Sequence, residues 1–146
     1  MRHVTHRGIQ LIKQFEGFEP KIYLDAAGYP TIGYGHLVRD YEREWFKNGI
    51  SEAAGEALLI KDLLAAEQAV LRLVKVPLTD GQFDALVSFT FNLGGGALQR
   101  STLRRKVNRE EHEVVPPEFM KWVWAGGKKL KGLVRRRAAE AERYVS

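Results

Sequence analysis

Residues 16–37 constrain the fold more than any other stretch, because they end one helix and start a β-hairpin almost at once. Upstream, apolar residues recur every three or four positions, which predicts a helix over 5–16. Gly17 stops this helix and Pro20 forbids its continuation. Glu16 is therefore predicted to be the last helical residue, at the point where the chain turns.

The predicted hairpin places a second carboxylate close to the first in sequence. A short alternating strand ends at Asp25, which is followed by a type I turn, and a return strand is predicted over 31–37. In strand geometry Gly33 and Gly35 share a face with Thr31, which leaves that face bare for a ligand. A helix end and a hairpin that bring two carboxylates to one cleft form the arrangement that cleavage of a glycosidic bond requires.

The rest of the chain reads as helical. Ser51 is predicted to cap a long helix over 51–74, which joins a small β-hairpin lobe at 1–50 to a helical lobe at 75–146. The fold class is thus α+β, mainly α, in one two-lobed domain over 1–146. Further helices are predicted over 79–91, which begins with a capping box at Thr79 and Gln82, and over 103–108, 119–124 and 134–145, the last with its basic residues on one side and Val134, Ala138, Ala141 and Val145 on the other. A stop is predicted at 92–96 and a loop at 110–117.

Composition excludes several classes of protein. The chain contains no cysteine, so it forms no disulfides and no thiolate zinc site. It has no apolar signal core and no apolar run of membrane-spanning length, so export is expected to need another protein. The net charge is +5, and residues 128–146 hold seven basic and two acidic residues, a surplus of 7 − 2 = +5. This tail is either a solvated helix face or a surface that faces a polyanion.

Several motifs together resemble one known family. Eight residues separate Glu16 from Asp25, and five separate Asp25 from Thr31. This spacing, inside a helix and hairpin frame, resembles the phage-type lysozymes of glycoside hydrolase family 24. The likeness also covers Thr-Ile-Gly-Tyr-Gly-His-Leu (31–37), Ala-Leu-Val-Ser-Phe-Thr-Phe-Asn-Leu-Gly (85–94), Trp122, Ala-Gly-Gly (125–127) and Gly-Leu-Val-Arg-Arg-Arg (132–137), the last three being similar to the tail of lambdoid endolysins.

The resemblance implies a lysozyme-like fold and a muramidase that hydrolyses the β-1,4 bond between N-acetylmuramic acid and N-acetylglucosamine in peptidoglycan, without metal or cofactor. Glu16 would be the general acid, Asp25 would activate or position water or stabilise the developing charge, and Thr31 would hold that water. The family is understood to invert configuration, which suits carboxyl groups about 6.5–9.5 Å apart. Singly, Glu16, Asp25 and Thr31 also fit ordinary roles as a solvated helix-end charge, a turn former and a strand residue.

The resemblance also implies supporting residues. His36 is expected to pair with Asp62 and brace the hairpin lobe against the long helix, and one of Arg135, Arg136 and Arg137 is expected to orient the acid; the sequence does not distinguish the three. The residues that match saccharide-contacting positions are Leu37, Phe91 and either Ser101 or Thr102, although Phe91 fits plain core equally well.

Two segments depart from the family pattern and leave alternatives. His-Glu-Val-Val-Pro-Pro (112–117) replaces a smoother helical stretch, and Lys-Lys-Leu-Lys (128–131) is unusually basic, which predicts contact with an anionic surface of the cell envelope. A lytic transglycosylase, a basic nucleic-acid-binding module and a peptidoglycan binder without activity are the rival functions. We expect a monomeric endolysin that acts on peptidoglycan, binds no nucleic acid, is made in the cytoplasm of the host bacterium and reaches the wall through a holin-type pore.

Overall fold

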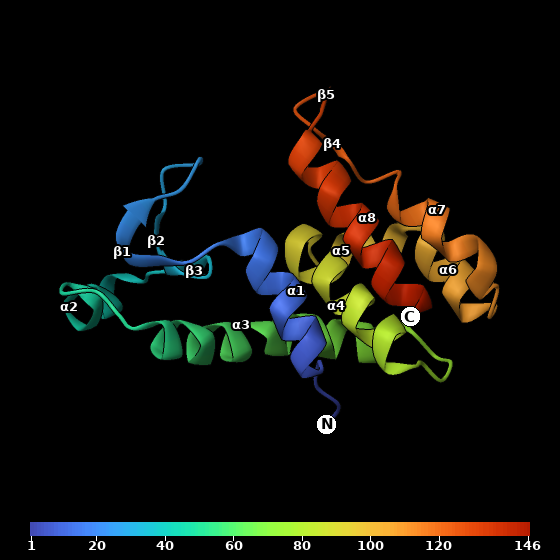
Figure 1. Cartoon of the computed structure of the whole chain (residues 1–146), viewed down its shortest axis with the longest axis horizontal. Helices are drawn as coiled ribbons and strands as arrows, with labels where there is room; N and C mark the ends of the chain where they lie inside the picture. Colours follow the sequence, from blue (N-terminus) through green and yellow to red (C-terminus); the bar gives the residue numbers. More distant parts are fainter. The chain divides into compact units, whose positions relative to one another are not determined.

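The computed structural model describes all of residues 1–146 and is mainly helical with two small antiparallel sheets (Figure 1), which confirms the predicted α+β class. The helices are α1 (His6–Glu16), α2 (Arg43–Phe46), α3 (Glu52–Leu73), α4 (Asp80–Leu93), α5 (Gly95–Arg100), α6 (Thr102–Asn108), α7 (Val115–Phe119) and α8 (Lys131–Val145), with short 3-10 turns η1 (Asp40–Glu42) and η2 (His112–Val114). The strands are β1 (Glu19–Leu24), β2 (Pro30–Gly33), β3 (His36–Leu37), β4 (Trp124–Ala125) and β5 (Lys128–Lys129).

The chain forms two compact units. One comprises Ile12–Leu64, which we call the hairpin unit, and the other comprises Met1–Leu11 with Ala65–Ser146, which we call the helical unit. The division falls inside α1 and inside α3. The lobe boundaries predicted at residues 50 and 75 stay a prediction.

The sheet of the hairpin unit has three strands in the order β1-β2-β3, so the return strand predicted over 31–37 is wrong in one respect. Gly33 and Gly35 have φ angles of 66° and 82°, which extended backbone does not adopt. The chain therefore turns back on itself after β2, and the residues from 36 form a third strand. These glycines make a turn and do not line a bare strand face.

The helical unit is built around α4. Thr79 and Gln82 form the predicted capping box, with Thr79 Oγ1 accepting from the Gln82 amide at 3.1 Å. Phe83, Leu86 and Phe89 of this helix are fully buried. Helix α8 packs against both α4 and α7 (Figure 1), so α4 lies at the centre of this unit's core.

Between residues 92 and 124 one prediction is correct but incomplete, and another is wrong. The glycines predicted as a stop end α4, where Gly94 has a φ of 93°, but Gly95 then begins α5, a helix that was not predicted. The predicted loop over 110–117 and helix over 119–124 are replaced by η2, by α7 and by the β4–β5 hairpin. Pro116 and Pro117 lie in the first turn of α7, where the missing amide hydrogens have no intrahelical partner to lose.

The buried side of α8 is formed largely by its arginines, and not by the apolar residues predicted on the opposite side. Arg136, Arg137 and Arg143 are buried, whereas Ala138 and Val145 are exposed. The arginines point inward because buried carboxylates of α4 and α8 meet them. The surplus charge of the C-terminal tail is therefore only partly on the surface.

Candidate active site

Helix α1 carries Glu16 at its last position, as predicted. The Gly17 amide donates to the Lys13 carbonyl at 3.0 Å, and Gly17 has a φ of 71°, so the helix ends in a left-handed glycine. One turn before Glu16, Lys13 pairs with Glu56 and, at 2.9 Å, with Glu52 on α3. This anchorage fixes the end of α1, and with it the half-buried Glu16, within the hairpin unit.

The charges of this anchor stabilise one another. Burial works against the charged form of Lys13, but its bonds to Glu56 and Glu52 raise the pKa of Lys13 above its usual value. Bonds from Lys13 and from the Tyr34 hydroxyl, at 2.8 Å, lower the pKa of Glu52. Both shifts favour the charged forms of Lys13 and Glu52 at neutral pH.

Asp25 is held by the turn that it begins. Its Oδ1 accepts from the Ala27 and Tyr29 amides, each at 2.9 Å, while the Gly28 amide donates to its carbonyl at 2.9 Å. The other carboxylate oxygen, Oδ2, has no hydrogen-bond partner in the structure. Asp25 therefore has one oxygen that fixes its orientation and one that is available to water or to substrate.

Three residues from the three strands form a row on one face of the sheet. Tyr23 is directly opposite Thr31, and Thr31 is directly opposite Leu37. Side chains of paired residues project from the same face of a sheet. Thr31 is 2% exposed and its hydroxyl donates to the Tyr29 carbonyl at 2.9 Å, whereas Leu37 is largely exposed. The hydrogen of the Thr31 hydroxyl is thus already donated, and the lone pairs of its oxygen are left to accept a hydrogen bond from water.

Gly35 brings Glu16 to this sheet. A Cβ added at Gly35 would lie 2.9 Å from Glu16 Oε1, so the carboxylate occupies the place that a side chain would need. The turn between β2 and β3 therefore requires glycine for its φ of 82° and for the approach of Glu16. The backbone of Gly35, which was predicted to be left bare for a ligand, is instead approached by Glu16, the predicted general acid.

Tyr23 is the site residue that sequence reasoning did not assign. Partial burial, and then the negative charges of Glu19, Asp25 and Glu16, raise the pKa of Tyr23 above its usual value. The negative charges of both predicted catalytic carboxylates, Glu16 and Asp25, thus contribute to the raised pKa of the Tyr23 hydroxyl. The available signal was the strand alternation, which placed Tyr23 and Asp25 on the same face.

His36 lies on the other face of the sheet, opposite Ile32 in the β2–β3 register. The predicted contact with Asp62 is present, with Nδ1 2.7 Å from Oδ2, and its role in stability stays a prediction. Sequence reasoning missed Glu42, whose Oε2 is 3.1 Å from His36 Nε2. Burial works to raise the pKa of Glu42, but the Arg39 amide and His36 hold it below its usual value.

The other predicted site residues belong to the helical unit. Phe91 is half-buried near the end of α4, and the exposed Thr102 accepts from Arg105 at 2.8 Å, while Ser101 caps α6. Arg136 is buried, with its Nε 3.4 Å from Glu140. Their parts in substrate binding and in orienting the acid stay predictions.

Arg135 and Arg137 differ sharply from each other. Arg135 is exposed, whereas Arg137 is fully buried between Glu140, at 2.8 Å, and Asn92, at 2.6 Å. Arg137 is therefore a core residue of the helical unit.

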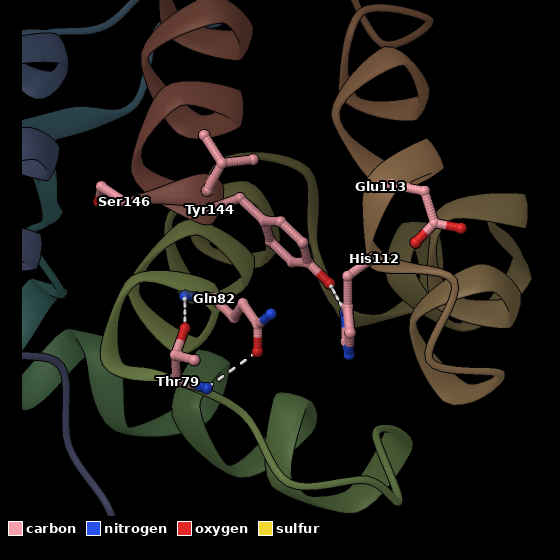
Figure 2. A pocket seen from close by; sticks show the side chains of 7 residues that line it. Thr79, Gln82, His112, Glu113, Tyr144 and Ser146 are labelled. Carbon is pink, nitrogen blue, oxygen red and sulfur yellow. Dashed lines mark hydrogen bonds between the residues drawn. The ribbon is translucent and has the colours of Figure 1, made fainter.

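A pocket of about 290 Å³ lies elsewhere in the helical unit (Figure 2). His112 Nδ1 is 2.6 Å from the Tyr144 hydroxyl at its wall, and burial raises the pKa of Tyr144. None of the predicted site residues lines it. The lining residues are Thr79, Gln82, His112, Glu113, Tyr144, Val145 and Ser146.

No three His, Asp or Glu side chains gather where they could hold a metal ion. None of the helices combines the length and the apolar character that crossing a membrane requires.

Comparisons with known proteins agree with one another. The family model described as phage lysozyme matches residues 13–140. An endolysin of Bacillus phage B103 is 41% identical over 146 residues, which cover 99% of this chain and 54% of that endolysin, so the chain spans about half the length of this relative. The endolysin of Salmonella phage P22 is 36% identical and is covered completely, as is this chain. A crystal structure of a P22 lysozyme variant has a TM-score of 0.91 at 34% identity, with both chains fully covered.

The fold and these likenesses define the class of the protein as a lysozyme, an enzyme with a mainly helical fold. The chain belongs to the phage lysozyme family, which confirms the family predicted from its sequence.

Proposed function

We propose that the protein is a peptidoglycan hydrolase, a muramidase of the endolysin type that cleaves the β-1,4 bond between N-acetylmuramic acid and N-acetylglucosamine. The observation that carries the proposal is the meeting of Glu16, at the end of α1, with the glycine turn of a sheet whose neighbouring turn holds Asp25. Two carboxylates from separate elements then act on one sheet face, and glycoside hydrolysis requires such a pair.

Each residue of the proposed site has one role. Glu16 donates its proton to the leaving glycosidic oxygen as general acid. Asp25, oriented through Oδ1, uses its unbonded oxygen to position or activate the attacking water, and the Thr31 lone pairs accept from the same water. Leu37, at the exposed end of the sheet row, contacts the saccharide.

The helical unit supplies the remaining proposed contacts. Phe91 and Thr102 contact the saccharide, and Arg136 orients the acid. His36 and Asp62 support the sheet from the face opposite Thr31. The protein acts as a monomer, is made in the host cytoplasm, reaches the wall through a holin-type pore and contacts an anionic surface of the cell envelope through its basic C-terminal region.

The test is Glu16→Gln, assayed by the clearing of purified cell walls, with circular dichroism as the folding check. We expect a loss of roughly 10²–10⁴-fold, the usual contribution of general acid catalysis. Glu44→Gln is the matched control, since Glu44 is an exposed carboxylate of the same unit that pairs with Lys47. A folded Glu16→Gln protein that clears walls at the unmodified rate would overturn the mechanism.

Mass spectrometry of the released fragments separates hydrolysis from its rival. A lytic transglycosylase releases 1,6-anhydro products, whereas water attack leaves a reducing end. The proposal expects reducing ends only, because Asp25 keeps an oxygen for water.

A further inference from the structure

The β4–β5 hairpin is a short projection of the helical unit (Figure 1). Trp124 pairs with Lys129 and Ala125 with Lys128, and Gly126 and Gly127 close the turn with φ angles of 57° and 76°. Two consecutive residues of positive φ form the tight hairpin turn that matches the twist of the strands. The hairpin is therefore ordered by its own backbone, and its side chains are free to serve another purpose.

The unpaired positive charge of the tail gathers at this hairpin. No acidic residue occurs between Glu118 and Glu140. Arg136, Arg137 and Arg143 are buried with Glu140 or Asp84, but four cations are exposed and form no ion pair. These four, which we call the basic cluster, are Lys128, Lys129, Lys131 and Arg135.

Stability of the fold does not explain this placement. Lys131 begins α8, and the first turn of the helix has no acidic residue. Cations at that end oppose the helix dipole, which favours negative charge there. The basic cluster thus destabilises the isolated protein slightly, and it is better explained by an anionic partner.

Apolar side chains stand among these cations. Trp124 is 62% exposed and Leu130 is 41% exposed. Because Trp124 and Lys129 are a cross-strand pair, the indole and the ammonium group project from the same face of the hairpin. A tryptophan beside lysines suits the boundary between lipid headgroups and acyl chains, where the ring is partly buried and the lysine extends toward phosphate.

We propose that the β4–β5 hairpin docks onto an anionic lipid bilayer, with Trp124 and Leu130 at the headgroup boundary and the basic cluster on the lipid phosphates. This docking rests on the proposed contact with an anionic surface of the cell envelope, and it identifies that surface as a lipid bilayer. A polyanion without a lipid phase would engage the lysines, but it would leave Leu130 exposed to water. The exposed apolar pair therefore favours a bilayer.

The first experiment measures binding to vesicles of phosphatidylglycerol and phosphatidylcholine in equal parts. Each basic residue near an anionic leaflet strengthens binding by roughly fivefold, so Lys128→Gln/Lys129→Gln/Lys131→Gln is expected to weaken it about 100-fold. The matched control is Lys61→Gln/Arg72→Gln/Lys75→Gln, which removes the same charge from exposed residues on and just after α3. Equal weakening by both variants, or none by the hairpin variant, would overturn the proposal.

The second experiment follows Trp124 alone, in Trp45→Phe/Trp122→Phe. The indole emission is expected to shift to the blue with the anionic vesicles and to stay unchanged with vesicles of pure phosphatidylcholine. An unchanged emission with the anionic vesicles would show that Trp124 stays in water and would contradict the docking. Circular dichroism checks the fold of each variant.

The vesicles contain no peptidoglycan, so this result is independent of catalysis. Glu16→Gln is expected to bind them as the unmodified protein does. A hairpin variant that loses binding to purified sacculi while keeping its binding to vesicles would assign the hairpin to the wall polymer and overturn the lipid proposal. Failure of the muramidase proposal would instead appear as an active Glu16→Gln protein.

Discussion

Glu140 and Asp84, two buried carboxylates of the helical unit, are held differently from Asp25 of the hairpin unit. In the helical unit, Glu140 is fully buried, with Ser88 Oγ 2.6 Å and Arg137 Nε 2.8 Å away, and Asp84 is fully buried against Arg143 at 2.8 Å. In the hairpin unit, Asp25 has one oxygen fixed by amides and the other without a partner.

The difference separates carboxylates that stabilise the fold from those that are available for chemistry. A buried carboxylate needs a partner for each oxygen, because an uncompensated charge is costly in the interior. A catalytic carboxylate needs a fixed orientation together with a free oxygen. Substitution of a buried, paired carboxylate should therefore reduce stability, whereas substitution of a carboxylate with a free oxygen should reduce activity.

The largest effect is expected from Glu140→Gln. It removes the negative charge between Arg136 and Arg137 and should lower the free energy of unfolding by roughly 3–5 kcal/mol. Urea unfolding followed by circular dichroism measures the change. Glu142→Gln, an exposed position on the same helix, is the control. A loss below about 1 kcal/mol would place Glu140 among ordinary surface carboxylates.

Asp25→Asn should give the reverse pattern. The asparagine side-chain oxygen still accepts from the Ala27 and Tyr29 amides, so the turn is kept and the free energy of unfolding should change by less than about 1 kcal/mol. The loss of the carboxylate should slow wall clearing roughly 100-fold or more, within the range of acid–base catalysis. Clearing at the unmodified rate would remove Asp25 from the mechanism, and Asp40→Asn is the control at an exposed turn.

Asp62→Asn tests a carboxylate that lies between the two classes. His36 is clamped between Asp62 and Glu42, and the loss of one charged partner should cost roughly 1–3 kcal/mol of stability while wall clearing remains. In a double-mutant cycle with Glu42→Gln, the two losses should not add, because both act on one imidazole. Complete loss of activity in a folded Asp62→Asn protein would make the pair catalytic.

The sequence predicted what local chemistry determines. Ser51 and Thr79 cap the helices they were expected to cap, and Gly17 ends α1 at Glu16. Asp25 begins the expected turn because a side chain that binds its own following amides needs no distant partner.

What the sequence did not predict depends on distant partners or on residues with two uses. The inward face of α8 is decided by Glu140 and by Asp84, which is 59 residues from Arg143 in the chain. Gly95 begins a helix although glycine normally ends one, and Pro116 lies in the first turn of α7 although proline breaks the interior of a helix. Glu42 was missed because nothing local marks it as the second partner of His36.

The smallest expected effect is on the pH dependence of stability. In the hairpin unit the Arg39 amide and His36 lower the pKa of Glu42 against the effect of burial, and in the helical unit Lys106 and Lys121 do the same for Glu118. Because both pKa values are below the unfolded value of 4.5, each group stabilises the fold above that pH.

This stabilisation should be lost as the pH falls from 4.5 through the lower folded values, by an amount on the order of 1 kcal/mol for each group. Urea unfolding at a series of pH values measures it. Glu42→Gln and Glu118→Gln should each reduce the dependence of the free energy of unfolding on pH below 4.5. The two reductions should be similar, because each glutamate is buried and its pKa is lowered by cationic or amide donors. If neither variant changes the loss of stability at low pH, other carboxylates drive acid unfolding in both units.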